Sequence, residues 1–156
     1  MRITERLKAE HGVFLWQLDY LQALVSSGAA REILQAVVET IAGAERRHAL
    51  IEERLLYPAL VAAVGGECVL LQRSKAEHDE LRRLSALIRS GTFDGTAVDE
   101  FAERLRLHLE SEIHDVFALA DDVLPAERLE SMSNWDADHI YEVYGKARPW
   151  AEKRLG

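Results

Sequence analysis

Two short segments of the sequence place a histidine four residues before a glutamate: His48 with Glu52, and His108 with Glu112. On an α-helix this spacing stacks the two side chains on one face, one turn apart. An imidazole nitrogen and a carboxylate on adjacent turns can hold one metal ion or contribute to two neighbouring ions. The repeated spacing therefore predicts a metal site built from helices.

Helical periodicity extends along most of the chain, and no segment shows the alternation of a β-strand. Apolar residues at helical spacing predict long helices, which we place at residues 4–26, 30–63, 67–90 and 96–123. The short connections between them imply that neighbouring helices run in opposite directions. We therefore predict an all-α protein, an antiparallel up-and-down four-helix bundle with a short C-terminal helical extension.

Local signals define the ends of these helices. Thr4 and Thr96 are predicted N-caps, and Gly28 suits the left-handed position that ends the first helix. Pro58 predicts a kink in the second helix because it removes one backbone N–H. The apolar stripe at the start of that helix is predicted to contain Ile33, Val37 and Ile41.

Two further histidines, His11 and His78, lie singly on apolar faces of the first and third predicted helices. Counting from each turn at 1.5 Å per residue, all four histidines and both glutamates reach one depth of the bundle, within about one helical turn. We therefore expect the six side chains to meet at the centre.

A lone histidine on an apolar face is more often a hydrogen-bonded core residue than a ligand. Two carboxylates converging with four imidazoles are different, because burying them is costly unless a cation or a paired charge compensates. The competing interpretation is a buried His–Glu hydrogen-bond network without metal. Ligands of this type, without thiolate, suit iron, manganese or zinc. Six of them exceed a tetrahedral zinc site and favour two octahedral ions, best a di-iron centre, bridged by Glu52 and Glu112.

The sequence resembles the hemerythrin family, the bacterial hemerythrin-like proteins with a cation-binding HHE domain, over residues 7–124. The resemblance rests on four motifs: Glu10-His11-Gly12-Val13-Phe14, His48-x-x-x-Glu52-Glu53 followed by Leu56-Tyr57-Pro58, Glu77-His78, and His108-x-x-x-Glu112. It implies an antiparallel four-helix bundle around two non-haem iron ions joined by an Fe–O–Fe type bridge. The implied ligands are His11, His48, Glu52, His78, His108 and Glu112.

One position departs from the family pattern. True hemerythrins supply two histidines from the third helix, one turn apart, whereas Ser74 stands four residues before His78 here. We therefore expect an open or water-filled position on the ion that His78 serves. The function expected is binding or sensing of oxygen, a related diatomic molecule or iron. The alternatives are a di-iron enzyme acting on peroxide or nitric oxide, an iron-delivery or repair protein, and a metal-free interaction module.

Composition restricts the partners and the location. A net charge of −8 argues against nucleic acid as the main partner, because phosphate binding needs a basic face. No apolar run is long enough to span a membrane, the first residues do not resemble a secretion signal, and the single cysteine, Cys68, forms no internal disulfide. We expect a cytoplasmic protein.

The chain is predicted to divide into a bundle domain, residues 1–124, and a C-terminal extension, residues 125–156, that packs on the bundle. A last short helix is expected from Asn134 or Asp136 to Tyr144. The extension is the most aromatic part of the sequence and gives its one indication of a homodimer or other partner surface. Its large aromatic residues are Trp135, Tyr141, Tyr144 and Trp150.

Other polar and aromatic residues are given lesser roles. Glu53 points about 100° away from Glu52 and is expected in solvent or behind a ligand. Tyr57 and Tyr20 can donate hydrogen bonds near the site, although we prefer core or boundary positions for both. Surface positions are predicted for Glu45, Glu110 and His114, a buried position for Cys68, and a place at the end of the bundle, away from metal, for His139.

Overall fold

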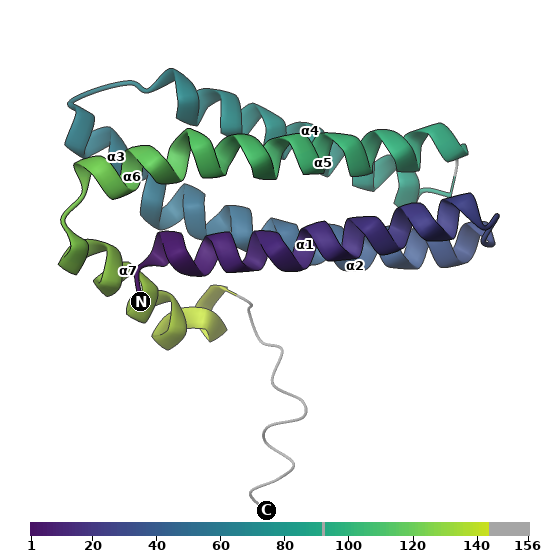
Figure 1. Cartoon of the computed structure of the whole chain (residues 1–156), viewed down its shortest axis with the longest axis horizontal. Coiled ribbons are helices and arrows are strands. Elements are labelled where there is room, and N and C mark those ends of the chain that lie inside the picture. Colours follow the sequence, from purple (N-terminus) through teal and green to yellow (C-terminus); the bar gives the residue numbers. More distant parts are fainter. Residues whose placement is uncertain (92, 144–156) are drawn as a thin grey trace, which may run out of the picture.

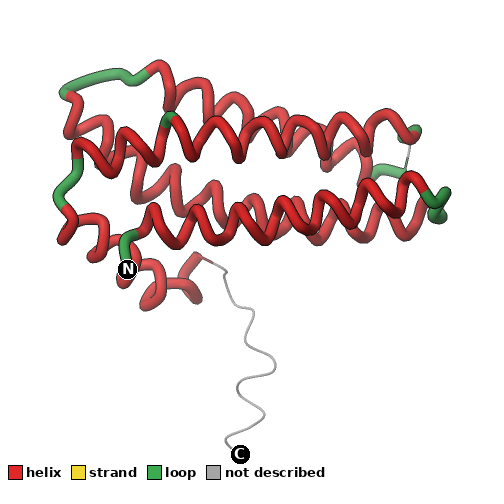
Figure 2. Tube along the Cα trace, in the orientation of Figure 1, coloured by secondary structure: helices red, strands yellow, loops and turns green. Residues whose placement is uncertain are grey.

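A computed structural model describes residues 1–91 and 93–143, and side chains as far as residue 134 apart from residue 92. Every regular element in these residues is helical, which confirms the all-α prediction (Figure 2). None of these helices combines the length and the apolar character needed to cross a membrane. The elements are α1 (Ile3–Ser26), α2 (Arg31–Ile51), the π-helical turn η1 (Glu52–Leu56), α3 (Tyr57–Val64), α4 (Val69–Arg89), α5 (Gly95–His114), α6 (Val116–Val123) and α7 (Ala126–Val143).

Long helical rods lie side by side and form the body of the molecule (Figure 1). The first is α1, the second is α2 continued by η1 and α3, the third is α4, and the fourth is α5 continued by α6. Contacts join α1 to α2, α2 to α4, α4 to α5 and α5 to α1, so each rod packs against two neighbours. This closed ring encloses a single interior that all four rods line.

Helix ends differ in part from the prediction. Gly28 adopts a φ of +70°, the left-handed conformation expected after the first helix. Thr4 is not a cap: it is buried inside α1, and its hydroxyl donates a hydrogen bond of 2.6 Å to Asp121. Thr96 is not a cap either, because Asp94 precedes the helix and accepts from the backbone N–H of Ala97. The Thr4 hydroxyl is thus engaged in a tertiary hydrogen bond, and the carboxylate of Asp94 takes the capping role predicted for Thr96.

The buried face of α2 is rotated from the predicted one. Ile33 is 49% exposed and Val37 is only half-buried, whereas Leu34 and Val38 lie in the core together with Ile41. Ile41 is buried as predicted, whereas at the other two positions the buried residue is the next one along the chain, about 100° further around the helix. The contacts with α1 and α4 choose between them.

The second rod is interrupted just before Pro58, where a kink was predicted. The interruption is η1, in which the backbone N–H of Tyr57 donates to the carbonyl of Glu52, five residues earlier. A π-helical turn of this kind inserts one extra residue into the helix. The side chains that follow are therefore rotated relative to a regular α-helix.

Two apolar clusters fill the interior on either side of a polar layer. One gathers around Phe101 and Leu18, and the other around Leu60 and Phe117. α7 contacts α1, and its Leu129 is fully buried in the second cluster. This helix begins at Ala126, eight residues before the predicted start at Asn134. The side chains of Trp135 and Tyr141 are not described, and Tyr144 and Trp150 lie outside the described residues.

Candidate metal centre

The six predicted ligand residues all lie in the polar layer between the two apolar clusters. Each is almost completely buried, with at most 3% of its surface exposed. All four rods contribute, so the layer is a cross-section of the whole bundle. The residues are His11 from α1, His48 from α2, Glu52 from η1, His78 from α4, and His108 and Glu112 from α5.

The first half of the layer, which we call the first half-site, contains His11 and His48. Their Nε2 atoms are 2.9 Å apart. Glu52 Oε1 lies 3.1 Å from His48 Nε2, and Glu112 Oε2 lies 3.5 Å from His11 Nε2. One ligand atom from each of the four residues lies within 4.8 Å of the others, close enough for one ion.

The second half-site contains His78 and His108. Glu52 Oε2 lies 3.4 Å from His78 Nε2, and Glu112 Oε1 lies 3.8 Å from the same nitrogen. Glu112 Oε2 lies 3.4 Å from His108 Nε2. Glu112 therefore belongs to both groups of potential ligands, while the two oxygens of Glu52 face different histidines. Both carboxylates lie between the two histidine pairs.

Several buried atoms of this layer lack hydrogen-bond partners in the described part of the chain. They include Glu52 Oε1, Glu112 Oε2 and His78 Nε2, all of which face the cluster. Leaving buried polar atoms unpaired is costly, and two carboxylates in an apolar core add a further cost. A cation bound by these atoms removes both costs, and imidazole and carboxylate ligands suit iron, manganese or zinc. The residues present therefore fit a metal centre.

Three of the four imidazoles are held by carboxylates from outside the layer. In each case the carboxylate accepts from Nδ1, which leaves the Nε2 lone pair directed into the cluster. This is the orientation that a metal-binding imidazole needs. The pairs are His48 with Glu10 (2.8 Å), His78 with Glu53 (2.8 Å) and His108 with Glu77 (2.9 Å). Of the two positions predicted for Glu53, in solvent or behind a ligand, the structure has the second.

An arginine in turn binds each of these carboxylates. The pairs are Arg6 with Glu10 (3.0 Å), Arg82 with Glu53 (2.8 Å) and Arg73 with Glu77 (2.9 Å). His11 is the exception among the four histidines, because no described carboxylate accepts from its buried Nδ1. Its ring is held by packing against Phe117, with centroids 5.1 Å apart.

Burial and charge separate the histidines by their proton affinity. Burial, together with the charge of His48, lowers the pKa of His11 to about 3. Burial also opposes protonation of His48, yet the carboxylates of Glu52 and Glu10 outweigh it and raise the pKa to about 10. The same balance, dominated by Glu52, raises the pKa of His78 to about 9. Metal binding to this layer must therefore displace protons.

Two hydroxyl groups reach the second half-site. Ser74, at the position of the missing histidine, is buried and donates to Glu112 Oε1 over 2.6 Å. The Tyr57 hydroxyl lies 2.8 Å from the same oxygen and 2.6 Å from Ser74 Oγ. The preferred prediction for Tyr57, a core aromatic without a role at the site, is therefore incomplete. Tyr20 is 52% exposed on α1, so its predicted core or boundary position is wrong.

The remaining predictions have mixed outcomes. Glu45 was predicted on the surface but is only 2% exposed, one helical turn before the histidine of α2, and burial raises its pKa. Its position on that buried face follows from the three-residue spacing, which was the signal available. Glu110 and His114 are exposed as predicted, and Cys68 is half-buried rather than buried. The side chain of His139 is not described.

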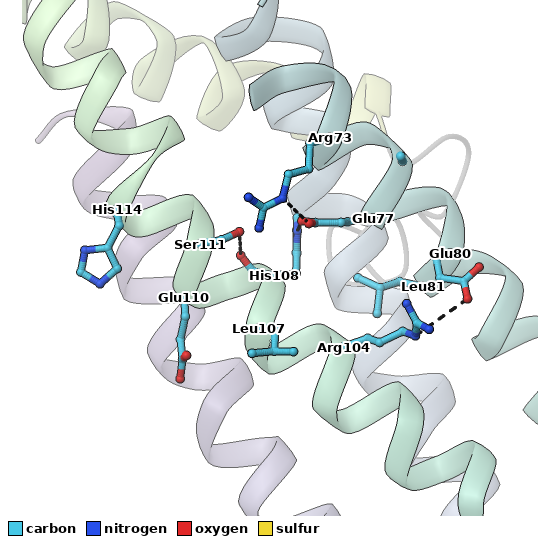
Figure 3. A pocket seen from close by; sticks show the side chains of 11 residues that line it. Arg73, Glu77, Glu80, Leu81, Arg104, Leu107, His108, Glu110, Ser111 and His114 are labelled. Atoms are coloured by element: carbon cyan, nitrogen blue, oxygen red, sulfur yellow. Dashed lines mark hydrogen bonds and ion pairs between the residues drawn. The ribbon is translucent and has the colours of Figure 1, made fainter. Parts of the chain in front are cut away.

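Surface hollows approach both half-sites. A groove of about 660 Å³ lies between α4 and α5, and His108 lines it beneath Glu77 and Arg73 (Figure 3). A smaller hollow of about 300 Å³, lined by His48 and Glu10, belongs to α1 and α2. Each half-site thus has one imidazole that lines a surface depression.

Comparison with known proteins agrees with this geometry. The family model of the hemerythrin HHE cation binding domain matches residues 2–120, which include all six residues of the layer. No curated protein and no solved structure matches the chain.

Proposed function

The chain belongs to the hemerythrin HHE cation-binding domain family, and on this premise we propose that it is a non-haem di-iron protein that binds or senses a small ligand. The ligand class is oxygen, a related diatomic molecule, or iron itself. Metal binding follows from the family and from the buried cluster, and the proposal adds the identity of the metal, the number of ions and the ligand.

One observation supports the number of ions. Glu52 and Glu112 lie between two histidine pairs, and the oxygens of Glu52 face different pairs, 3.1 Å from His48 and 3.4 Å from His78. A single tetrahedral ion needs four ligands and leaves one pair unused. Two ions use all six residues, with the carboxylates between them. Iron is favoured because it accepts imidazole and carboxylate together and retains positions for another ligand.

We also propose that the four rods form the antiparallel bundle of the family. In support, the end of α1 and the start of α2 lie at one end of the molecule together with the end of α4 and the start of α5 (Figure 1). The end of α3 and the start of α4 lie at the opposite end. In this arrangement each rod crosses the polar layer once, which brings ligands from distant parts of the sequence to one depth.

The protein residues around the centre bind, orient and exclude water. Glu10, Glu53 and Glu77 fix three imidazoles, and the apolar clusters on both sides keep solvent from the layer. When bound, iron supplies the open coordination positions and the redox chemistry that these side chains lack. Each half-site has two imidazoles and shares two carboxylates, so an octahedral ion there would keep coordination positions for a further ligand.

A second candidate function is a di-iron enzyme that acts on peroxide or nitric oxide, or an iron-delivery or repair protein. The observation that favours it is the pair of hydroxyls, Ser74 and Tyr57, beside Glu112. Hydroxyls at this place can donate hydrogen bonds to a reduced oxygen species, which reversible oxygen carriage does not require.

The first test is anaerobic loading with ferrous iron, followed by an iron count per chain and a visible spectrum after oxygen is added. About two ions and a reversible oxygen-dependent band support binding or sensing. Two ions that oxidise irreversibly support the enzyme or iron-handling alternative, and peroxide turnover is then assayed. Failure to bind iron, or binding of one zinc ion alone, contradicts the proposal.

A further inference from the structure

The oxygen atom of Tyr57 lies beside the carboxylates of the polar layer, although the residue is not among the six predicted ligands. We propose that Tyr57 is a metal ligand of the second half-site. It would occupy the coordination position of the missing fifth histidine, which is replaced here by Ser74. This inference rests on the proposed di-iron centre and adds one protein ligand to it.

The π-helical turn η1 is what places Tyr57 in the layer. In a regular α-helix a residue five positions after Glu52 points about 140° away from it. In η1 the N–H of Tyr57 donates to the Glu52 carbonyl, which closes a wider turn and brings the two residues close to one face. Such turns are frequent at functional sites. The backbone therefore carries a local irregularity whose effect is to present both a carboxylate and a phenol to the same place.

The phenol oxygen lies near the same two carboxylate oxygens that surround His78 Nε2. It lies 2.8 Å from Glu112 Oε1 and 3.5 Å from Glu52 Oε2. These two oxygens lie 3.8 Å and 3.4 Å from His78 Nε2. Neighbouring ligands on one ion, at bond lengths of about 2.1 Å, are separated by about 3 Å. The phenol oxygen is thus as close to the two carboxylates as the imidazole nitrogen is.

Burial and local contacts hold the phenol in this position. Tyr57 is 1% exposed, and its ring lies parallel to that of His78 with centroids 6.3 Å apart. Ser74 Oγ, at 2.6 Å, supports the hydroxyl from the side of α4. A histidine at this position of α4 would fill the space next to Glu112, and the smaller serine leaves that space to the phenol.

The chemistry is a proton-for-metal exchange. When the metal binds, the phenol O–H bond breaks, an oxygen–metal bond forms, and the proton leaves to solvent. Tyrosine oxygen is an established ligand of ferric iron in proteins. The competing arrangement is a neutral phenol that only donates a hydrogen bond to Glu112, and the experiment below separates the two.

The experiment uses the full chain loaded with iron and oxidised to the ferric state. Iron content, the visible spectrum and the resonance Raman spectrum are recorded for the wild type, Tyr57→Phe and Tyr20→Phe. Tyr20 is the matched control, because it is a tyrosine on the exposed side of α1. We expect a phenolate-to-iron charge-transfer band with phenolate ring modes in the wild type and in Tyr20→Phe. Tyr57→Phe should lose both signals while retaining its iron.

The remaining outcomes are also decisive. If the wild type binds two ions but shows no phenolate ring modes, Tyr57 is not a ligand, and the di-iron proposal stands without it. The same conclusion follows if the modes persist in Tyr57→Phe. If the wild type binds no iron, both proposals fail. The wild-type Raman spectrum requires no variant, so a folding defect in Tyr57→Phe does not prevent a decision.

Discussion

The two half-sites arise from the same sequence pattern but have different surroundings. In the first, the rings of His11 and His48 are 4.7 Å apart, and aromatic side chains pack against them, Phe117 against His11 and Phe14 against His48. Among the described residues, a carboxylate lies behind His48 but none lies behind His11.

In the second half-site both imidazoles are held by carboxylates, and two hydroxyls lie against Glu112. The two half-sites thus share the spacing of their ligands and differ in the residues behind those ligands. We therefore expect two inequivalent ions, the second held in a more rigid environment.

The largest effect is expected from the residue that both half-sites share. Glu112→Ala removes a ligand from both groups, so the iron content should fall from about two ions to fewer than one per chain. Helicity in circular dichroism should be retained, because alanine favours helix and the variant also removes a buried charge. The control is Glu110→Ala on the exposed side of α5. Two retained ions would show that Glu112 is not shared.

A smaller and one-sided loss is expected at the first half-site. His11→Ala should reduce the iron content to about one ion per chain, because Glu52, Glu112, His78 and His108 remain to bind the other. The ion count is combined with the Raman spectrum, in which the phenolate modes of the second half-site should persist. Loss of those modes together with both ions would mean that the half-sites bind only as a unit.

The carboxylates behind the histidines give the next largest effect. Glu53→Gln keeps the shape of the side chain but no longer accepts from His78 as an anion, so metal affinity at the second half-site should fall about 10-fold to 100-fold. Competition with a chelator measures the change. Glu10→Gln, the equivalent substitution behind His48, should leave that ion unaffected. Equal losses at both ions in each variant would contradict the separation of the half-sites.

Between pH 6.5 and 10 the stability of the metal-free protein should fall as the pH rises, whereas that of the metal-bound protein should change less. The folded-state pKa of His48, about 10, exceeds its unfolded value of about 6.5. In the metal-free protein its contribution is therefore complete below pH 6.5 and is lost as the pH rises towards 10. Metal must displace this proton, so the stabilisation by metal should grow over the same range. Thermal unfolding of both forms from pH 6 to 10 tests this, and parallel curves would contradict it.

The smallest effect is expected at the surface. Arg73→Ala removes the ion-pair partner of Glu77. The Arg73 side chain is 57% exposed to solvent. Exposed ion pairs contribute little, so the affinity for metal should change by less than about twofold. The same chelator competition measures it. A loss as large as that of Glu53→Gln would show that the arginine, and not only the carboxylate, fixes the imidazole.

Much of the site follows from short-range spacing. The separation of His48 from Glu52 is read within one helical turn, and the depth of each helix follows from its turn, so the six residues were predicted to meet. Spacing alone did not predict which apolar residues of α2 are buried and which are exposed. Leu34 and Ile33 are equally apolar, and packing against the neighbouring rods decides between them.

The predictions for Glu45 and Tyr57 were wrong or incomplete for different reasons. Glu45 lies three residues before His48, so helical spacing already placed it on the buried face, and its charge misled the assignment. For Tyr57 a core or boundary position was preferred to a hydrogen bond near the site, and regular helical geometry does turn this residue away from Glu52. A π-helical turn has no reliable sequence signal, and Pro58 indicated only that the helix is disturbed.

The π-helical turn also has a consequence for chain length. Between Glu52 and Tyr57 the second rod contains one residue more than a continuous α-helix needs to bring the two onto one face. Deleting the exposed Arg54 would let a continuous α-helix keep the two on one face, whereas regular winding of the present sequence would turn Tyr57 and all of α3 away from Glu52. At this point the centre depends on a count of residues as well as on their identity. Two sequences that differ by one residue here can therefore present the same two side chains, one through a π-helical turn and the other through a regular helix.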